Sequence, residues 1–516
     1  MEWWIAMIDA VETEIKLVSS PAVLKRMRTH PQLAGAEETA NLVTTYFDTD
    51  GARLRRGGAT LRIRDTGKFC EQTLKLSDPG GSTVRRAEWS VVADGMRPKP
   101  ETFPPKARAA LAQLADGAAL ETIATTRIVR TSRRLRFMES NIEIAFDVGT
   151  IQAGNREEKM CEFELELVEG SLADVVALAL TLPIGPKLSW SVVSKAERCH
   201  MLAFGIPPAA VMAPPVKLQQ KMDVGEGFQA IAWSCLEQVL ANYPLVIASG
   251  DPEALHQSRV AIRRLRAACA IFGDIVDDDE GAELRAELKA VAGGLGPARD
   301  LHVLLGGVEA ELNTVEGDFS ELLAHLASQR DAATRTAQRL LASKPFQRLL
   351  FQFAGWIEGG AWLARKNETG GNRPLKPFAA HVLTQRRKKL FKSPKDVADL
   401  SDSARHRLRI DGKKLRCAVS FFAPLYRSKA AAKPRRDFDQ ELKKLQDNLG
   451  ELNDMVVAVA AQGTLFSGFD PINGARLRAQ LDGLLATNAS SRRRLLKKAE
   501  RSLSRLMDIP AWWKAV

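Results

Sequence analysis

The feature that most constrains the fold is a strict alternation of charged and apolar residues in two stretches far apart in the chain. In residues 11–17, Glu12, Glu14 and Lys16 point one way and a mainly apolar set points the other. Residues 161–167 repeat the pattern with three glutamates: Glu162, Glu164 and Glu166. A period of two predicts β-strands with one charged face. Because like charges on facing strands repel, two acid-lined strands in one domain need cations between them.

The alternation continues through most of the first 205 residues. Turn signals such as Asp78-Pro79-Gly80-Gly81 separate the strand-like segments. About eight strands in one run predict an antiparallel sheet closed into a barrel. After the first strand, the predicted strands are residues 42–48, 60–65, 70–76, 83–92, 126–137, 141–148 and 160–168, with short helices at 21–28, 173–180 and 194–204.

A proline-rich stretch, residues 206–217, separates this region from the rest of the chain. Such a composition predicts a semi-rigid linker. Beyond it, the apolar residues recur with the period of a helix almost to the end of the chain. We therefore predict an α+β protein with two domains: a β-barrel domain at 1–205 and an all-helical domain at 218–510.

The helical region contains an internal repeat. The segment from His256 to Arg266 recurs as the segment from His406 to Arg416, with basic residues in matching places. At nearly the same distance after each copy comes a Leu-Gly motif that ends in an aspartate. Matching order and spacing predict two homologous helical bundles. Their expected spans are 218–360 and 374–510, joined around Gly359–Pro374, where glycine, asparagine and proline cluster.

The charged faces of the predicted strands would line the inside of the barrel if their apolar faces pack against helices. Burying an unpaired ion is very costly, so these acids and bases must neutralise each other or a ligand. Arginines and lysines on several walls suit phosphoryl oxygens, and clustered glutamates suit Mg²⁺ or Mn²⁺. For one strand, a solvated charged face is the more common explanation. Six strands that share the feature favour a site for metal-assisted phosphoryl transfer.

Seven motifs occur along the first 200 residues in the order found in CYTH domains. They are Glu12-x-Glu14-x-Lys16, Leu61-Arg62-Ile63-Arg64, Thr73-Leu74-Lys75, Arg86-Ala87-Glu88, Ile142-Glu143-Ile144-Ala145-Phe146-Asp147, Glu162-x-Glu164-x-Glu166 and Ser194-Lys195-x-x-Arg198. The first domain therefore resembles the triphosphate tunnel metalloenzymes. The basic helical repeat resembles the CHAD domain, an all-helical module that binds polyphosphate. Together they resemble the bacterial CYTH–CHAD inorganic triphosphatases over nearly the whole chain.

This resemblance implies an eight-stranded antiparallel tunnel that hydrolyses triphosphates with Mg²⁺ or Mn²⁺. The implied acidic set that holds metal and positions water is Glu12, Glu14, Glu162, Glu164 and Glu166, with Glu88 added to the catalytic residues. The implied phosphate-binding set is Lys16, Arg62, Arg64, Lys75, Arg86, Arg130 and Lys195. In the strand at 126–137, four arginines compete for the inward place: Arg127, Arg130, Arg133 and Arg134. Which glutamate orients the attacking water stays open.

In the helical domain, the repeated segment places basic residues at i, i+3, i+7 and i+10, on one stripe of a helix. The two stripes are His256, Arg259, Arg263 and Arg266, and His406, Arg409, Lys413 and Arg416. A like-charged stripe repels itself unless an anion lies along it. On one helix, a solvated basic face is the more common explanation. The duplication favours binding of long-chain polyphosphate, although the histidines serve equally well as half-buried structural donors.

Composition limits the setting in which the chain works. A formal net charge of +12 favours a polyanionic partner, and 6 cysteines without a CxxC motif indicate a reducing compartment. The start of the chain lacks the basic region of a signal peptide, and Met7 is the expected true start. No apolar run suggests a membrane span. We expect a cytoplasmic protein that does not use a membrane and that associates with polyphosphate granules.

Four functions compete at this stage. The first is hydrolysis of inorganic tripolyphosphate to pyrophosphate and phosphate. The second is another tunnel activity: hydrolysis of nucleoside or thiamine triphosphates, or adenylate cyclisation. Those substrates need a pocket for a base or ring, and the predicted inner face offers charges and few aromatic residues. The third is non-catalytic polyphosphate binding, which the intact carboxylates disfavour. The fourth is nucleic-acid binding, which 6% aromatic residues serve poorly because they give no stacking platform.

Overall fold

The computed structural model describes residues 10–77, 85–312, 315–392, 396–466, 470–486 and 489–514. The expected start at Met7, the predicted turn at 78–81 and residues 83–84 of one predicted strand lie outside this set. The chain divides into two compact units. The barrel unit comprises Met1–Met212, Leu236–Leu245 and Leu341–Ala361. The helical unit comprises Ala213–Cys235, Val246–Leu340 and Trp362–Val516.

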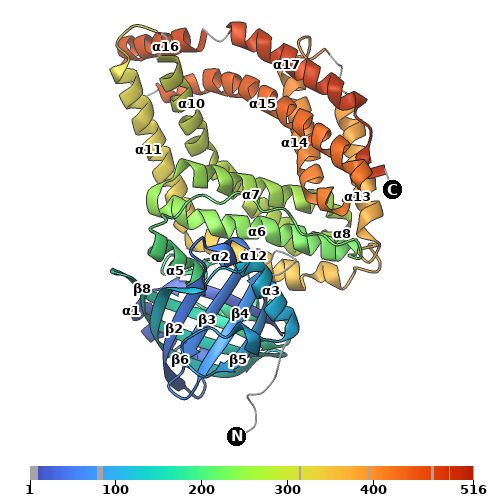
Figure 1. The fold of residues 1–516 in the computed structure, drawn as a ribbon. Helices are drawn as coiled ribbons and strands as arrows, with labels where there is room; N and C mark the ends of the chain where they lie inside the picture. Colours follow the sequence, from blue (N-terminus) through green and yellow to red (C-terminus); the bar gives the residue numbers. More distant parts are fainter. Residues whose placement is uncertain are drawn as a thin grey trace. The chain divides into compact units, whose positions relative to one another are not determined.

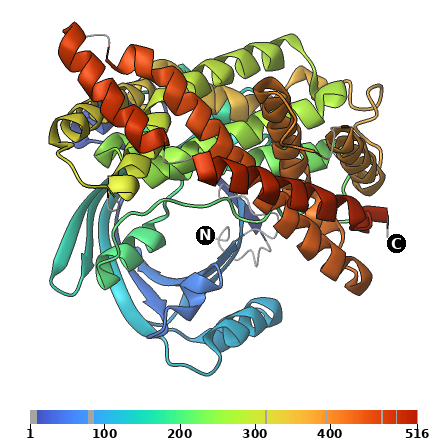
Figure 2. The ribbon, with the colours of Figure 1, turned by 90° about the horizontal axis from the view of Figure 1, so that it is seen from above.

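The barrel unit contains one sheet whose strands close on themselves (Figures 1 and 2). The strands are β1 Ala10–Ser19, β2 Glu38–Asp48, β3 Ala59–Asp65, β4 Cys70–Ser77, β5 Arg85–Ala93, β6 Glu121–Phe137, β7 Ser140–Ala153, β8 Arg156–Glu169 and β9 Leu188–Ser191. Their order is β5-β4-β3-β2-β6-β7-β8-β1-β9, and β5 also pairs with β1. All these pairings are antiparallel. The prediction of a closed eight-stranded antiparallel barrel is therefore confirmed, and β9 adds to it beside β1.

The alternation in the sequence explains which side of the sheet faces inward. Leu61, Ile63 and Leu74 are fully buried in a core cluster that also contains Leu111 of a covering helix, α3. The residues between them along β3 and β4 carry the charges. The apolar faces of these strands thus pack outward against a helix, and the charged faces turn into the barrel. The helical elements of this region are α1 Pro21–Met27, η1 Pro31–Leu33, α2 Arg53–Arg56, η2 Pro100–Thr102, α3 Pro105–Ala115, α4 Leu172–Thr181 and α5 Lys195–Phe204.

Helix α5 has clear start and stop signals. The hydroxyl of Ser194 caps it by accepting a hydrogen bond of 3.1 Å from the backbone N–H of Glu197. Gly205 ends it with a φ of 62°, the left-handed conformation that glycine adopts most easily. Lys195 consequently occupies the first turn, where it is 7% exposed.

Two helix segments that follow the proline-rich linker in sequence belong to the barrel unit. The hydroxyl of Tyr243 donates a 3.0 Å hydrogen bond to the carbonyl oxygen of Trp190. The Trp190 ring stacks on Phe351 with 4.5 Å between centroids. Arg348 donates a 2.8 Å hydrogen bond to the carbonyl oxygen of Leu180, at the end of α4. The barrel unit therefore completes its core with residues from far along the chain.

The rest of the chain is helical, as predicted. The helices are α6 Val224–Ser249, α7 Pro252–Ile271, α8 Gly273–Val276, α9 Asp279–Gly294, α10 Gly296–Leu312, α11 Ser320–Ala342, α12 Lys344–Gly359, η3 Ala361–Leu363, α13 Leu375–Phe391, α14 Asp402–Phe422, η4 Ala423–Leu425, α15 Lys429–Leu465, α16 Pro471–Ala486, α17 Ala489–Asp508 and η5 Trp512–Lys514. Among the described residues, α6 is the one helix long and apolar enough to cross a membrane, and 72% of its most apolar window is buried. Burial of that extent is typical of a core helix.

The two copies of the repeated segment form α7 and α14, which lie next to each other in the helical unit. Phe272 and Phe422, the matching residues that follow each stripe, have ring centroids 6.0 Å apart. Arg264 of α7 lies over the ring of Phe421 of α14, with 5.3 Å from its guanidinium carbon to the centroid. The copies differ at their Leu-Gly motifs: the first falls at the break between α9 and α10, whereas α15 runs through the second unbroken.

Candidate functional site

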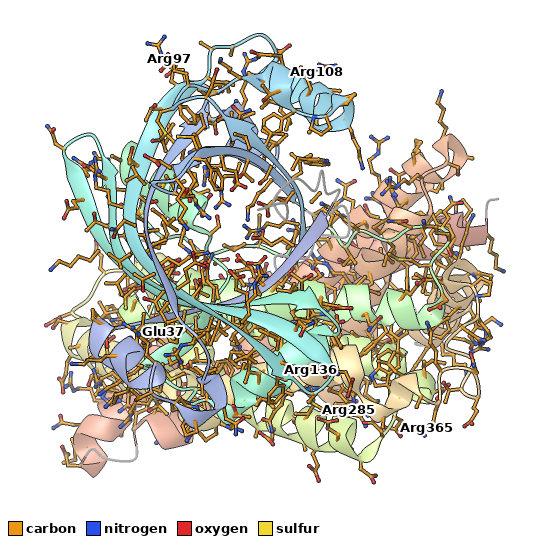
Figure 3. All side chains as sticks on the ribbon, turned by 90° about the horizontal axis from the view of Figure 1, so that it is seen from below. Glu37, Arg97, Arg108, Arg136, Arg285 and Arg365 are labelled. Carbon is orange, nitrogen blue, oxygen red and sulfur yellow. The ribbon has the colours of Figure 1, made fainter. Side chains whose placement is uncertain are left out.

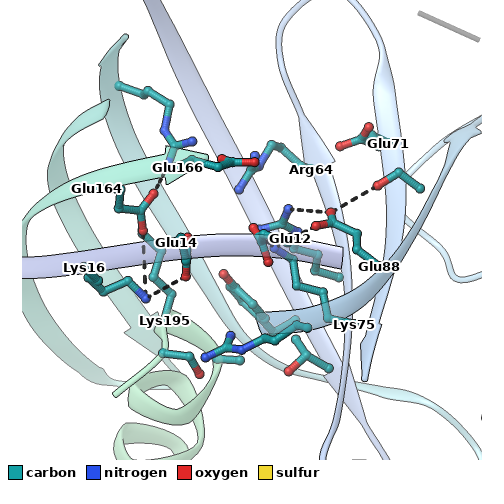
Figure 4. A pocket seen from close by; sticks show the side chains of 18 of the residues that line it. Glu12, Glu14, Lys16, Arg64, Glu71, Lys75, Glu88, Glu164, Glu166 and Lys195 are labelled. Atoms are coloured by element: carbon teal, nitrogen blue, oxygen red, sulfur yellow. Dashed lines mark hydrogen bonds and ion pairs between the residues drawn. The ribbon is translucent and has the colours of Figure 1, made fainter. Parts of the chain in front are cut away.

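A cavity of about 200 Å³ lies inside the barrel (Figure 4). Viewed from below, side chains from the surrounding strands project into the ring of the barrel (Figure 3). The cavity is lined by equal numbers of cations and acids: Lys16, Arg62, Arg64, Lys75, Arg86, Arg130 and Lys195 with Glu12, Glu14, Glu71, Glu88, Glu143, Glu164 and Glu166. Since the formal charges balance, most of these groups can neutralise one another when no ligand is bound.

One wall carries carboxylates on three neighbouring strands. Glu166 of β8 lies directly opposite Glu14 of β1 on one side and Glu143 of β7 on the other. Burial, followed by repulsion from Glu12 and from these neighbours, raises the pKa of Glu166 to about 8. Like charges placed opposite each other in a sheet are unfavourable. At neutral pH this wall therefore holds a proton that a cation could displace.

A second group of charges centres on Lys195. Its ammonium nitrogen lies 2.9 Å from carboxylate oxygens of Asp147 and Glu162 and makes a close ion pair with Glu164. The guanidinium of Arg130 lies 2.6 Å from Asp147 and 2.5 Å from Glu164. Burial alone would raise the pKa of Glu164, but Lys195, Arg130 and Lys16 outweigh burial and hold that pKa well below its usual range. Glu164 is therefore ionised and fully committed to cations.

The third group lies where β1, β4 and β5 meet. The ammonium of Lys75 lies 2.5 Å from Glu12 and 3.1 Å from Glu88, and Arg62 lies 3.7 Å from Glu88. Burial favours the neutral form of Glu88, yet Lys75 and Arg62 keep its pKa below the ordinary value. The second oxygen of Glu12, Oε2, is buried without a hydrogen-bond partner. A buried carboxylate oxygen in this state can accept a bond from a ligand or bind a cation.

The structure brings every predicted site residue of the first domain to this cavity except Glu162. The Glu162 carboxylate is completely buried beneath it, between Lys195 and Arg198, whose guanidinium lies 2.7 Å away. Of the four competing arginines, Arg130 lines the cavity. Arg133 instead donates hydrogen bonds to the carbonyl oxygens of Leu33 and Arg28, outside the barrel. Arg127 is exposed, and Arg134 forms an ion pair with Glu143.

Several lining residues were not among the predicted site residues: Tyr46, Thr60, Glu71, Ser90, Glu143, Ser194 and Ala196. A signal for Glu71 was available, because it precedes Thr73 and Lys75 at the same parity on β4. Glu143 belongs to one of the seven motifs, but the resemblance gave it no role. Tyr46 offered no signal, since an aromatic residue next to a phenylalanine in a strand usually belongs to the core.

The acidic lining fits a hard divalent cation by its chemistry. Carboxylate oxygens are the preferred ligands of Mg²⁺ and Mn²⁺, and both the unpartnered Glu12 Oε2 and the crowding at Glu166 are relieved by a positive charge. Within the described ranges, no group of three or more His, Cys, Asp or Glu side chains has the geometry of a metal site. The reason is visible in the ion pairs: Glu12 and Glu164 are turned toward lysines and arginine.

In the helical unit, the two predicted stripes act on each other. Burial, together with Arg409 and Arg263, lowers the pKa of Lys413 to about 8. The matching arginines Arg259 and Arg409 each bury one guanidinium nitrogen, Nη1 and Nε respectively, without a hydrogen-bond partner. The positive charge of Arg263 on α7 thus disfavours the charged form of Lys413 on α14. An anion between the two helices would reduce this repulsion.

The aspartates of the Leu-Gly motifs supply the nearest acids to these stripes. Asp300 lies 4.0 Å from Arg259. Burial raises the pKa of Asp454, against the opposing effect of Arg409. The ring of His406 makes a 3.0 Å hydrogen bond with Asn453. Arg263, Arg266 and His406 are exposed, and the other stripe residues are half-buried, so both stripes can be reached from solvent.

Comparison with known proteins covers most of the chain. Residues 10–199 match the family model described as the CYTH domain, and residues 230–461 match that of the CHAD domain. An inorganic triphosphatase of Haemophilus influenzae is 31% identical over 204 residues, 37% of this chain and 54% of that protein. The chain thus spans about half the length of this relative.

Two further similarities extend into the helical region. An uncharacterized protein of Mycobacterium tuberculosis is 26% identical over 457 residues, 81% of each chain. The crystal structure of the CHAD domain from the plant Ricinus communis is 29% identical in sequence. It covers 58% of this chain and 97% of its own, with a TM-score of 0.49.

Proposed function

The chain consists of a CYTH domain followed by a CHAD domain, and we propose that it hydrolyses inorganic tripolyphosphate to pyrophosphate and phosphate inside the barrel. The reaction would depend on Mg²⁺ or Mn²⁺. The CHAD domain would bind long-chain polyphosphate without cleaving it. The name of the Haemophilus relative, an inorganic triphosphatase, supports the activity.

The observation that carries the proposal is the size and lining of the barrel cavity. Its volume is about 200 Å³, below the roughly 300–1,000 Å³ of pockets that hold drug-sized ligands. Charged side chains make up most of the wall, and Tyr46 is the one aromatic residue among those that line it. A base or a thiazole ring would find almost no apolar surface here. A small substrate made only of phosphate groups fits better.

The charge balance of the cavity supports metal dependence. Because its cations already face an equal number of carboxylates, a highly charged polyanion can enter only if positive charge enters with it. In this proposal Glu12, Glu14, Glu164 and Glu166 would hold the divalent ion, which supplies charge neutralisation and orientation of phosphoryl oxygens. Glu162 would act from beneath by holding Lys195 in place.

The cations would bind the phosphoryl oxygens. Arg64 is the clearest case, since burial and then its neighbours Arg62 and Arg130 lower its pKa to about 10. An anion beside Arg64 would remove that penalty. Lys195 and Arg130 would exchange their contacts with Glu164 for phosphate oxygens when substrate and metal enter together. The remaining members of the phosphate-binding set are Lys16, Arg62, Lys75 and Arg86.

Phosphate release from three substrates tests the proposed specificity. With purified full-length protein at saturating Mg²⁺ or Mn²⁺, tripolyphosphate should give a kcat/KM at least tenfold above those of ATP and thiamine triphosphate. The Glu164→Gln variant, prepared identically, measures background from contaminating phosphatases. Equal or faster turnover of either organic triphosphate would overturn the assignment. If none of the three substrates is hydrolysed, non-catalytic polyphosphate binding is the function that remains.

Binding of long-chain polyphosphate by the CHAD domain is supported by the two stripes on α7 and α14. The unpartnered guanidinium nitrogens of Arg259 and Arg409 and the lowered pKa of Lys413 all favour an anion between these helices. We further propose a cytoplasmic location with recruitment to polyphosphate granules, which such binding would support. The formal net charge of +12 agrees with a polyanionic partner.

Metal binding should depend on pH through Glu166. Its pKa of about 8 means that it is protonated at pH 7, and a metal ion must displace that proton. The apparent affinity for Mn²⁺, measured calorimetrically without substrate, should rise about tenfold per pH unit up to pH 8 and then level off. Glu166→Gln should weaken binding and flatten the dependence, whereas Glu71→Gln should keep it. A parent protein with pH-independent affinity between 6 and 8 would contradict the role of Glu166.

A further inference from the structure

Helix α17, Ala489–Asp508, presents an exposed row of cations that the proposed sites do not use. Its apolar side is already covered, since Leu495, Ala499, Leu503 and Leu506 are buried in the helical unit. The helix runs alongside α15 (Figure 1). Its exposed basic residues are Arg492, Arg493, Arg494, Lys497, Lys498, Arg501 and Arg505. Residues 489–508 also lie beyond the segment that matches the CHAD family model.

Few acids neutralise this row. Arg492 lies 3.4 Å from Asp402, and Arg505 lies 3.6 Å from Glu441. No carboxylate of the described residues lies within 4.0 Å of the charged atoms of Arg493, Lys497 or Arg501, which are therefore without ion-pair partners. The row contrasts with the barrel cavity, where equal numbers of acids and bases face each other.

The three unpaired cations form a straight line. Arg493, Lys497 and Arg501 are four residues apart, so they follow one side of the helix with a rise of about 6 Å between neighbours. Like charges at this spacing destabilise a helix. A linear polyanion that lies along the axis would meet all three cations in turn and remove that repulsion.

The row is connected to the α14 stripe through Asp402. This residue pairs with Arg492 of α17 and also lines a cavity of about 260 Å³ whose wall includes His406 and Arg409. Arg405 lies in the same wall and pairs with Asp402 at 2.6 Å. Basic side chains therefore continue from Arg409 of the stripe, through Arg405 near the start of α14, to Arg492 of α17.

We propose that the basic face of α17 is a second docking surface for the polyphosphate chain that binds between α7 and α14. This inference rests on the proposed polyphosphate binding. The described exposed side chains of α17 include no aromatic residue, so they offer no stacking platform for nucleic-acid bases. The buried apolar side leaves nothing to insert into a lipid surface. An inorganic polyanion, which offers charge alone, matches a face that offers charge alone.

Binding of fluorescent long-chain polyphosphate to the full-length protein tests this surface. The titrations contain EDTA, so that cleavage is suppressed, and are repeated over a range of salt concentrations. The test variant is R493Q/K497Q/R501Q, in which glutamine keeps the helix propensity. The matched control is K289Q/R335Q/R339Q, which neutralises three exposed cations on α9 and α11. Circular dichroism verifies that both variants are folded.

Loss of three phosphate contacts should lower the slope of log K against log salt by about 2 and weaken binding about tenfold at low salt. The control should bind as the parent does. Tripolyphosphate, whose proposed site is the barrel cavity, should bind all three proteins equally. Equal binding of the long chain by the test and control variants would overturn the second surface.

The same titrations separate failure of this inference from failure of the proposed function. The variant with both stripes neutralised, R259A/R263A/R409A/K413A, reports on the stripes themselves. If it binds polyphosphate as well as the parent does, the proposed function of the CHAD domain fails. If the α17 variant retains polyphosphate binding but loses binding to duplex DNA or to anionic vesicles, the surface belongs to that partner instead.

Discussion

Replacing Glu164 with glutamine should abolish hydrolysis of tripolyphosphate and leave the barrel folded. Glu164 lines the cavity and contacts Lys195 and Arg130. In the proposed site, its negative charge would help to hold the metal and would position these two cations for phosphate. Loss of a carboxylate that holds a catalytic metal should lower kcat by about three orders of magnitude. The measurement is phosphate release at saturating Mg²⁺, with a thermal melt on the same preparation.

The matched control is Glu71→Gln, another lining carboxylate in the same barrel. It lies outside the predicted acidic set and should retain activity within about tenfold of the parent. Fold should survive the loss of charge at residue 164 because Asp147 and Glu162 still neutralise Lys195. Full turnover by the Glu164→Gln variant would remove this residue from the metal-binding set.

Removing the inner cations of both stripes should abolish polyphosphate binding by the CHAD domain. In R259A/R263A/R409A/K413A, the groups that would contact phosphate oxygens on α7 and α14 are lost together. Four charge-assisted contacts at about 1.5–3 kcal/mol each exceed the free energy needed for a thousandfold loss of affinity. A mobility-shift titration of the full-length protein with long-chain polyphosphate measures the change.

A second quadruple variant, K289A/R335A/R339A/K443A, removes the same number of exposed charges from α9, α11 and α15, outside the two stripes. It should bind polyphosphate with the parent's affinity. The helical content of both variants should be unchanged by circular dichroism. Polyphosphate binding that survives in the stripe variant, or a strong preference for duplex DNA at matched charge, would contradict the assignment.

The barrel could be predicted because its signal is local. A charged and an apolar face alternate within each strand, and only a closed sheet buries every apolar face and hides every charged one. The same pattern could not separate Glu162 from Glu164, which share one parity on β8. What separates them is helix α5, whose Arg198 pairs with the fully buried Glu162 at 2.7 Å.

Neighbouring strands decided the ambiguities in β6. Four arginines occur within residues 127–134, and Arg130 faces inward opposite Asp147 of β7. The pairing register that joins them depends on the β6–β7 turn, which a strand pattern does not reveal. Tyr46 was not predicted for a related reason. It lies opposite Arg62 of β3, so its place in the cavity follows from the register between β2 and β3.

The contacts of Trp190 with Tyr243 and Phe351 imply an order of events during synthesis. A domain whose residues are contiguous can fold as soon as its last residue leaves the ribosome. Here the barrel unit draws on Leu341–Ala361, so its core stays incomplete until most of the following helices have been made. Until α12 emerges, the ring of Trp190 lacks Phe351 and the carbonyl oxygen of Leu180 lacks Arg348, so this side of the barrel unit stays uncovered during synthesis.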